Sequence, residues 1–252
     1  MPQRYFDLAT PRVLAHRGLA LEAPENTLLS FAAALGLGIE FIETDVHASS
    51  DGFAVVSHDS ELRRVADRAG VVADFPMAQL RKVDLGESQG FCSLAEALDT
   101  FPETRFNIDV KSADAIEPTA RAVREANAIG RVLITSFNER RRRETVRLLP
   151  GVATSASAPI FASALLAAKA GATPLLRRIL RDIDALQVPE RALGLAVTTE
   201  RMIRLFHSAG VEVHIWTIND PLAMHRLLDL GVDGIVTDRA DLALAVLSER
   251  RG

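Results

Sequence analysis

Two carboxylates, Glu43 and Asp45, lie two residues apart in a short apolar, β-branched run, Phe41–Val46. Residues i and i+2 of a strand point to the same side. Two carboxylates on one buried side repel each other and are poorly solvated unless a cation lies close to both. The spacing therefore predicts oxygen ligands for a hard divalent ion, Mg²⁺ or Ca²⁺.

Two histidines, His16 and His58, each follow a strand-like run. Imidazoles on opposite sides of a reacting group can act as general base and general acid near neutral pH. A single histidine is more often a packing or hydrogen-bonding residue. This pair, however, is accompanied by the carboxylates and by Arg17, whose planar fork of donors suits a phosphate. Among the remaining histidines, His47 deserves notice because it follows the carboxylate pair directly.

Asp109 and Lys111 repeat the i, i+2 spacing in a later run. Asp109 could supply a third carboxylate, and Lys111 could be a point charge for a phosphate oxygen. The same pattern fits a structural layer of salt bridges in the core, and spacing alone leaves both interpretations open. Trp216, the only tryptophan, fits core packing and a flat apolar wall for a small polyol equally well.

Eight short apolar runs alternate with amphipathic stretches, a pattern typical of βα units and a parallel sheet. The runs are Val13–Ala15, Phe41–Val46, Phe106–Val110, Val132–Ser136, Val152–Ser155, Ala185–Val188, Glu212–Thr217 and Gly234–Val236. The amphipathic stretches are Thr27–Leu37, Leu94–Thr100, Ala115–Ala128, Glu139–Leu148, Phe161–Leu180, Glu200–Ala209, Pro221–Leu228 and Leu242–Arg250. Eight such units predict an α/β fold, a (β/α)8 TIM barrel, whose functional groups come from the carboxyl ends of the strands. An open doubly wound sheet is the alternative, but no glycine-rich phosphate-binding motif follows the first strand.

The second strand is followed by a further apolar run, Phe53–Ser57, after too few residues for a parallel crossover. An Asp-Gly pair at 51–52 indicates a hairpin instead. This hairpin would carry His58 back over the mouth of the barrel. We therefore expect one domain over residues 1–252, with a small insertion after strand two at about residues 47–92.

Composition excludes several classes of protein. The net charge of −4 argues against a nucleic-acid surface, and the single cysteine, Cys92, excludes an intrachain disulfide or a Cys-rich zinc site. The first residues lack the apolar core of a signal peptide. No window approaches the roughly 20 apolar residues of a membrane span. We expect a cytoplasmic protein without stable membrane insertion; its oligomeric state stays open.

Taken together and in order, the motifs resemble the glycerophosphodiester phosphodiesterase family. They are Ala15-His16-Arg17-Gly18, Pro24-Glu25-Asn26-Thr27, Glu43-Thr44-Asp45-Val46, Ser57-His58-Asp59, Asn107-Ile108-Asp109-Val110-Lys111, Ile215-Trp216-Thr217-Ile218-Asn219 and Gly231–Asp238, and they span nearly the whole chain. The resemblance implies hydrolysis of a small-molecule glycerophosphodiester to glycerol phosphate and an alcohol, through a cyclic phosphate. It also implies the TIM barrel and a bound Mg²⁺ or Ca²⁺.

The resemblance assigns a role to each motif. It implies catalysis by His16 and His58, metal binding by Glu43, Asp45 and Asp109, and substrate binding by Arg17, Lys111 and Trp216. The family more often has Glu where this chain has Asp109, so the third metal ligand is one methylene shorter here. Two alternatives stay open: a lysophospholipase D-like activity on lysophospholipids, and a catalytically silent barrel that only binds.

Overall fold

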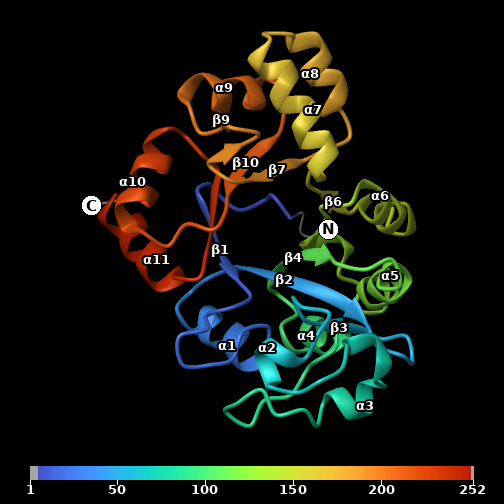
Figure 1. Ribbon diagram of the computed structural model, residues 1–252. Coiled ribbons are helices and arrows are strands. Elements are labelled where there is room, and N and C mark those ends of the chain that lie inside the picture. Colours follow the sequence, from blue (N-terminus) through green and yellow to red (C-terminus); the bar gives the residue numbers. More distant parts are fainter. Residues whose placement is uncertain (1–4, 251–252) are drawn as a thin grey trace.

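The computed structural model describes residues 5–250, and its centre is a barrel of parallel strands (Figure 1). The barrel strands are β1 (Arg12–His16), β2 (Phe41–Ala48), β4 (Arg105–Val110), β5 (Val132–Thr135), β6 (Ala153–Thr154), β7 (Ala185–Val188), β10 (Glu212–Ile215) and β11 (Gly234–Thr237). Hydrogen bonds link them in the order β6-β5-β4-β2-β1-β11-β10-β7. A parallel bridge between Ser155 and Ala185 joins the two ends of this series. The predicted eight-stranded barrel is confirmed, although β10 ends at Ile215 rather than at Thr217.

Helices surround the barrel on the outside (Figure 1). They are α1 (Leu28–Gly36), α4 (Leu94–Thr100), α5 (Ile116–Glu125), the short 3₁₀ helix η2 (Ile129–Arg131), α6 (Glu139–Leu148), α7 (Ala158–Lys169), α8 (Thr173–Ile179), α9 (Glu200–Ser208), α10 (Pro221–Asp229) and α11 (Ala240–Glu249). The prediction of one helix over Phe161–Leu180 is wrong, because the chain divides it into α7 and α8. Gly171, between them, has a φ of +70°, a left-handed conformation that ends a helix. Pro174 then lies in the first turn of α8, where proline is well tolerated.

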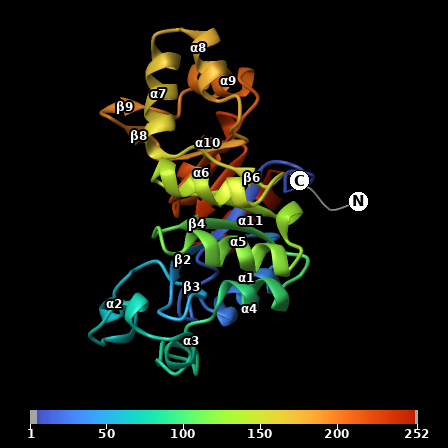
Figure 2. The same cartoon turned by 90° about the vertical axis from the view of Figure 1, so that its right-hand side faces the viewer.

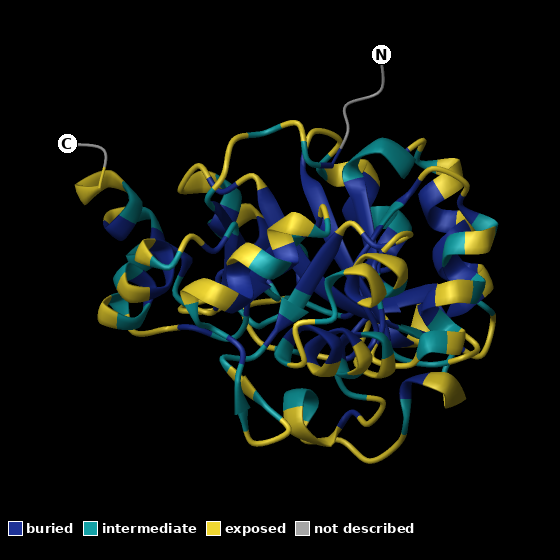
Figure 3. Ribbon diagram, turned by 90° about the horizontal axis from the view of Figure 1, so that it is seen from above, coloured by how far each residue is buried: buried dark blue, intermediate teal, exposed yellow. Residues whose placement is uncertain are grey.

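Burial follows this layered arrangement. The strands are buried on both faces, as the dark blue ribbons at the centre of Figure 3 show, and the outward sides of the helices are exposed. The largest fully buried side chains of the main core include Phe31, Phe106 and Phe206. Between residues 5 and 250, none of the helices has both the length and the apolar character needed to cross a membrane.

A hairpin extends β2 beyond the barrel. β2 pairs antiparallel with β3 (Ala54–Val56), with Val46 opposite Val56, which confirms the predicted hairpin. Residues 57–92, called the insertion below, then form α2 (Arg63–Ala66), the 3₁₀ helix η1 (Val72–Asp74) and α3 (Met77–Leu80) before α4. A separate cluster of buried side chains supports this part of the chain: Val55, Leu62, Val72, Met77, Leu80, Val83 and Phe91.

A second, shorter hairpin, β8 (Arg191–Ala192) with β9 (Leu195–Ala196), follows β7. This hairpin and α2 of the insertion project from the same end of the barrel (Figure 2). That end receives the carboxyl ends of the barrel strands, where a (β/α)8 barrel carries its functional loops. The two hairpins therefore stand on opposite sides of the mouth.

Candidate active site

The carboxyl ends of the strands surround a cavity of about 410 Å³. All the residues that the sequence predicts for the site line this cavity: His16, Arg17, Glu43, Asp45, His58, Asp109, Lys111 and Trp216. They come from β1, β2, β4, the hairpin after β2 and the end of β10. The structure thus brings together residues that lie up to 200 positions apart in the chain.

His16, the last residue of β1, is held by a carboxylate from the far end of the chain. Its Nδ1 atom lies 2.6 Å from Oδ1 of Asp238, and Asn219 donates to the other oxygen of Asp238 at 2.8 Å. Burial lowers the pKa of His16, but the hydrogen bond to Asp238 and the charge of Glu43 outweigh it, so the pKa is raised. The free nitrogen is Nε2, which lies 3.8 Å from Oε2 of Glu43.

The three predicted metal ligands are all buried. Burial, with the nearby charge of Asp45, raises the pKa of Glu43 to about 8. Burial also raises the pKa of Asp109, more strongly than the charge of Lys111 lowers it. For Asp45 the balance is reversed: burial is outweighed by Lys111, so the pKa is lowered. An ionised Glu43 is therefore costly in this site unless further positive charge is present.

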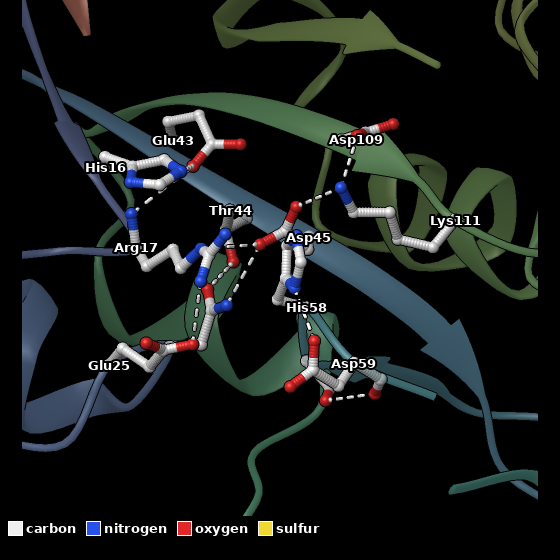
Figure 4. A network of polar contacts seen from close by, with 12 residues as sticks. His16, Arg17, Glu25, Glu43, Thr44, Asp45, His58, Asp59, Asp109 and Lys111 are labelled. Atoms are coloured by element: carbon white, nitrogen blue, oxygen red, sulfur yellow. Dashed lines mark hydrogen bonds and ion pairs between the residues drawn. The ribbon is translucent and has the colours of Figure 1, made fainter. Parts of the chain in front are cut away.

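Lys111 lies between two of these carboxylates. Its Nζ atom is 2.8 Å from Oδ1 of Asp45 and 2.7 Å from Oδ2 of Asp109 (Figure 4). The second oxygen of Asp109, Oδ1, is buried and has no hydrogen-bond partner. Within residues 5–250, no three His, Cys, Asp or Glu side chains are arranged so that they could hold a metal ion. The ammonium group of Lys111 provides the positive charge between Asp45 and Asp109 in this arrangement.

Arg17 follows His16 in a left-handed conformation, with φ of +58°. Its backbone N–H donates to the carbonyl oxygen of Glu43 at 2.9 Å, and its guanidinium donates to Glu25 at 3.0 Å and lies 3.4 Å from Asp45. Gly18 makes this turn possible, because a Cβ atom there would lie 2.5 Å from the hydroxyl of Ser30. The His-Arg-Gly motif thus turns the chain sharply and keeps the guanidinium at the cavity.

His58 comes from the loop after β3 and lines the same cavity as His16. Its Nδ1 atom lies 2.6 Å from Oδ1 of Asp59, which leaves Nε2 free. His47 holds the same loop, with Nε2 at 3.1 Å from the carbonyl oxygen of His58. Burial lowers the pKa of His47, which favours the neutral imidazole. Since a carbonyl oxygen only accepts, Nε2 of His47 carries the proton and donates it.

The other half of the cavity is apolar. Trp216, half-buried, stacks edge to face on Phe137 with the ring centres 5.9 Å apart. Phe161 of α7 and Leu193 of the β8–β9 hairpin continue this wall. Phe137 and Leu193 are 56% and 66% exposed, which is unusual for large apolar side chains beside a cavity. Trp216 therefore lies in a wall of the cavity, in line with its interpretation from the sequence as a flat apolar wall.

Sequence reasoning assigned no role to Asp238, Asn219 or Asp59, although all three lie in the motifs quoted above. Their position in the loops that follow strands was the available signal, because these loops are where a barrel carries functional groups. The side chain of Asn26 donates to Asp45 at 3.1 Å and accepts from Thr44 at 2.7 Å. Asn26 thus orients one predicted metal ligand from the loop before α1.

Comparison with known proteins agrees with this geometry. A model of the glycerophosphoryl diester phosphodiesterase family matches residues 16–242. A Mycobacterium tuberculosis protein named probable glycerophosphodiester phosphodiesterase 2 is 44% identical over 239 residues, which make up 94% of this chain and 90% of that protein. A lysophospholipase D of Mus musculus is 24% identical over 260 residues, 90% of this chain and 83% of that one. The fold also matches an Oleispira antarctica phosphodiesterase in complex with the product sn-glycerol-3-phosphate, with a TM-score of 0.79, 24% identity and coverage of 95% of this chain and 97% of that chain.

Proposed function

Because the chain belongs to the glycerophosphoryl diester phosphodiesterase family, we propose that it hydrolyses glycerophosphodiesters to glycerol phosphate and an alcohol with a divalent metal ion and two imidazoles. One observation carries the proposal: both imidazoles, the three carboxylates and the two cations line a single cavity. A silent binding barrel would be expected to lack one of these groups. The substrate is a small-molecule diester, and the chemistry is that of a phosphodiesterase.

The donor set fits a hard divalent ion. The negative charge of Glu43, Asp45 and Asp109 exceeds the positive charge of Lys111. Burial, together with the nearby charge of Asp45, raises the pKa of Glu43 to about 8. The unpartnered Oδ1 of Asp109 is a buried oxygen that a cation would satisfy. Glu43, Asp45 and Asp109 would hold Mg²⁺ or Ca²⁺ once the ammonium of Lys111 turns toward a phosphate oxygen. When bound, such an ion neutralises charge on the phosphate and acidifies a bound hydroxyl.

The two imidazoles supply the proton transfers. In the first step the 2-hydroxyl oxygen of the glycerol bonds to phosphorus, and the bond from phosphorus to the alcohol oxygen breaks. Nε2 of one histidine takes the hydroxyl proton, and Nε2 of the other gives its proton to the departing alcohol. Water then opens the cyclic phosphate with the two roles exchanged. Asp238 and Asp59 support both roles, because each holds an Nδ1 atom and leaves Nε2 available.

The test is an activity assay on glycerophosphocholine with Mg²⁺ and Ca²⁺ compared. We expect metal-dependent release of glycerol phosphate, reduced on the order of 10²–10⁴-fold in His16→Ala and in His58→Ala. A glycerophosphodiester of p-nitrophenol assigns the roles, because its leaving group needs no proton. The variant that lacks the general acid should recover most of its activity on this substrate. Full activity of either variant on glycerophosphocholine would disprove the two-histidine mechanism.

A second candidate substrate is a lysophospholipid, and the apolar half of the cavity favours it. Phe137 and Leu193 expose apolar surface beside the mouth, and a relative is named a lysophospholipase D. An acyl chain would cover this surface, whereas the choline of glycerophosphocholine would not need it. We expect Leu193→Ser to lower kcat/KM for a lysophospholipid and to leave that for glycerophosphocholine unchanged. An equal effect on both substrates would argue against this candidate.

A further inference from the structure

A row of charged groups connects the insertion with the rim of the barrel. Arg64, in α2 of the insertion, donates through Nε to Oδ2 of Asp59. Its Nη1 and Nη2 atoms donate to both oxygens of Glu25, at 3.0 and 2.6 Å. Arg64 therefore binds two carboxylates that belong to different loops, one before α1 and one after β3. In Figure 4, both carboxylates lie below Asp45, Glu25 on the side of Arg17 and Asp59 on the side of His58.

Each of these two carboxylates holds a residue of the proposed mechanism. Asp59 uses its other oxygen for Nδ1 of His58, at 2.6 Å. Glu25 accepts from Nη1 of Arg17 at 3.0 Å. The series Arg17–Glu25–Arg64–Asp59–His58 thus links the arginine that follows β1 to the histidine in the loop after β3. The hydrogen bond to Glu25, more than that to Asp59, raises the pKa of Arg64, so its guanidinium stays positively charged.

We infer that Arg64 is a positioning residue for the phosphodiesterase reaction, acting through Asp59 on His58 and through Glu25 on Arg17. The inference rests on the proposed roles of His58 and Arg17. Arg64 does not line the main cavity; it lines a second one beside it, which His58 and Lys111 share. Arg64 therefore acts by fixing the directions of two groups that face the substrate.

A purely structural role fits the geometry less well. The side chain of Arg64 is 48% exposed, and ion pairs at such positions contribute little to stability. Its three donors are divided between two carboxylates. The rigid planar fork of arginine fixes the directions of these bonds, whereas the rotatable ammonium of lysine would not. The neighbouring Arg63 is a matched control: it lines the same second cavity, but it is more exposed and pairs with Asp67 at 3.6 Å. The same helix thus offers one arginine that bonds to Glu25 and Asp59 and one that pairs elsewhere.

The experiment compares Arg64→Gln with Arg63→Gln in the full chain. We expect kcat to fall roughly tenfold or more in Arg64→Gln, because small displacements of catalytic groups cost up to about 10²-fold. KM should change less than kcat, and Arg63→Gln should behave as wild type. Both variants should melt within about 3 °C of wild type. Arg64→Lys should recover only part of kcat, and added guanidinium should partly rescue Arg64→Ala.

A double-mutant cycle with Asp59→Asn tests the path of the effect. If Arg64 acts through Asp59, the fold-loss of kcat in the double variant is smaller than the product of the fold-losses in the two single variants. Unchanged kcat in Arg64→Gln, or equal losses in Arg63→Gln, would overturn the inference. The His58→Ala variant distinguishes failure of this inference from failure of the proposed function. A fully active His58→Ala refutes the proposed function. An inactive His58→Ala with a fully active Arg64→Gln refutes only the role of Arg64.

Discussion

The Nδ1 atom of His16 and the Oδ1 atom of Asp238 lie 2.6 Å apart, although 222 positions separate the two residues in the chain. The contact is possible because β1 and β11 are neighbours in the barrel, with Ala15 opposite Thr237. Asn219 supports the carboxylate from the loop after β10. The pair fixes the imidazole with Nδ1 protonated and Nε2 toward the cavity.

Asp238→Asn should lower kcat on the order of 10²-fold, because the amide no longer secures the tautomer of His16. Burial lowers the pKa of His16, and the hydrogen bond to Asp238 raises it. The substitution should therefore lower this pKa and move the limb of the kcat/KM pH profile that reports ionisation of His16 to lower pH. Asp182→Asn, at an exposed site, is the control. An unshifted pH profile of kcat/KM would contradict the assignment.

Glu43→Gln should stabilise the metal-free protein at alkaline pH. The folded pKa of about 8 lies above the ordinary 4.5, so the stability linked to this group is complete below pH 4.5 and is lost as pH rises through about 8. Glutamine cannot ionise and avoids this loss. Melting curves in EDTA at pH 5 and pH 9 should show a gain for the variant at pH 9 only. Added Mg²⁺ or Ca²⁺ should raise the melting temperature of wild type and not of the variant.

Asp109→Glu should bind the divalent ion more tightly than wild type. The longer side chain can bring an oxygen closer to Asp45 and Glu43, whereas Oδ1 of Asp109 now has no partner. Asp109→Asn should weaken metal binding roughly tenfold or more, because even mutation of residues that only support the metal ligands lowers metal affinity by about this factor. Calorimetric titration with Mg²⁺ and Ca²⁺ measures both. Equal affinity in all three proteins would remove residue 109 from the metal site.

Glu212→Gln should make the protein less sensitive to acid. Burial raises the pKa of Glu212, but hydrogen bonds from Arg12 and His214 dominate and bring it to about 2. The stability from this group is therefore present above pH 4.5 and is lost as pH falls toward 2. For a partly solvated group this amounts to about 2 kcal/mol. Urea unfolding at pH 3 and pH 6 should show a smaller difference in the variant, and an equal difference would contradict the prediction.

The fold and most of the site followed from local patterns. The period of two along β2 predicted that Glu43 and Asp45 point to one side, and both line the cavity. The Asp-Gly pair at 51–52 predicted the hairpin that carries His58. The contacts of Asp238 and Arg64 could not be predicted in this way. The contact of Asp238 with His16 depends on closure of the barrel. The contacts of Arg64 depend on an insertion whose sequence has no regular hydrophobic period. The position of Lys111 between two carboxylates depends on side-chain geometry that spacing does not determine.

The hydrogen bonding around the barrel is uneven. Six residue pairs align between β2 and β4, which carry the carboxylates, whereas a bridge between Ser155 and Ala185 joins the β6 and β7 sides. The start of α7, after β6, and the loop after β7 contribute Ala158 and Pro189 to the cavity lining. We therefore expect substitutions on this side, where fewer residue pairs align, to change the preferred substrate, while the reaction centre on the opposite arc keeps its geometry.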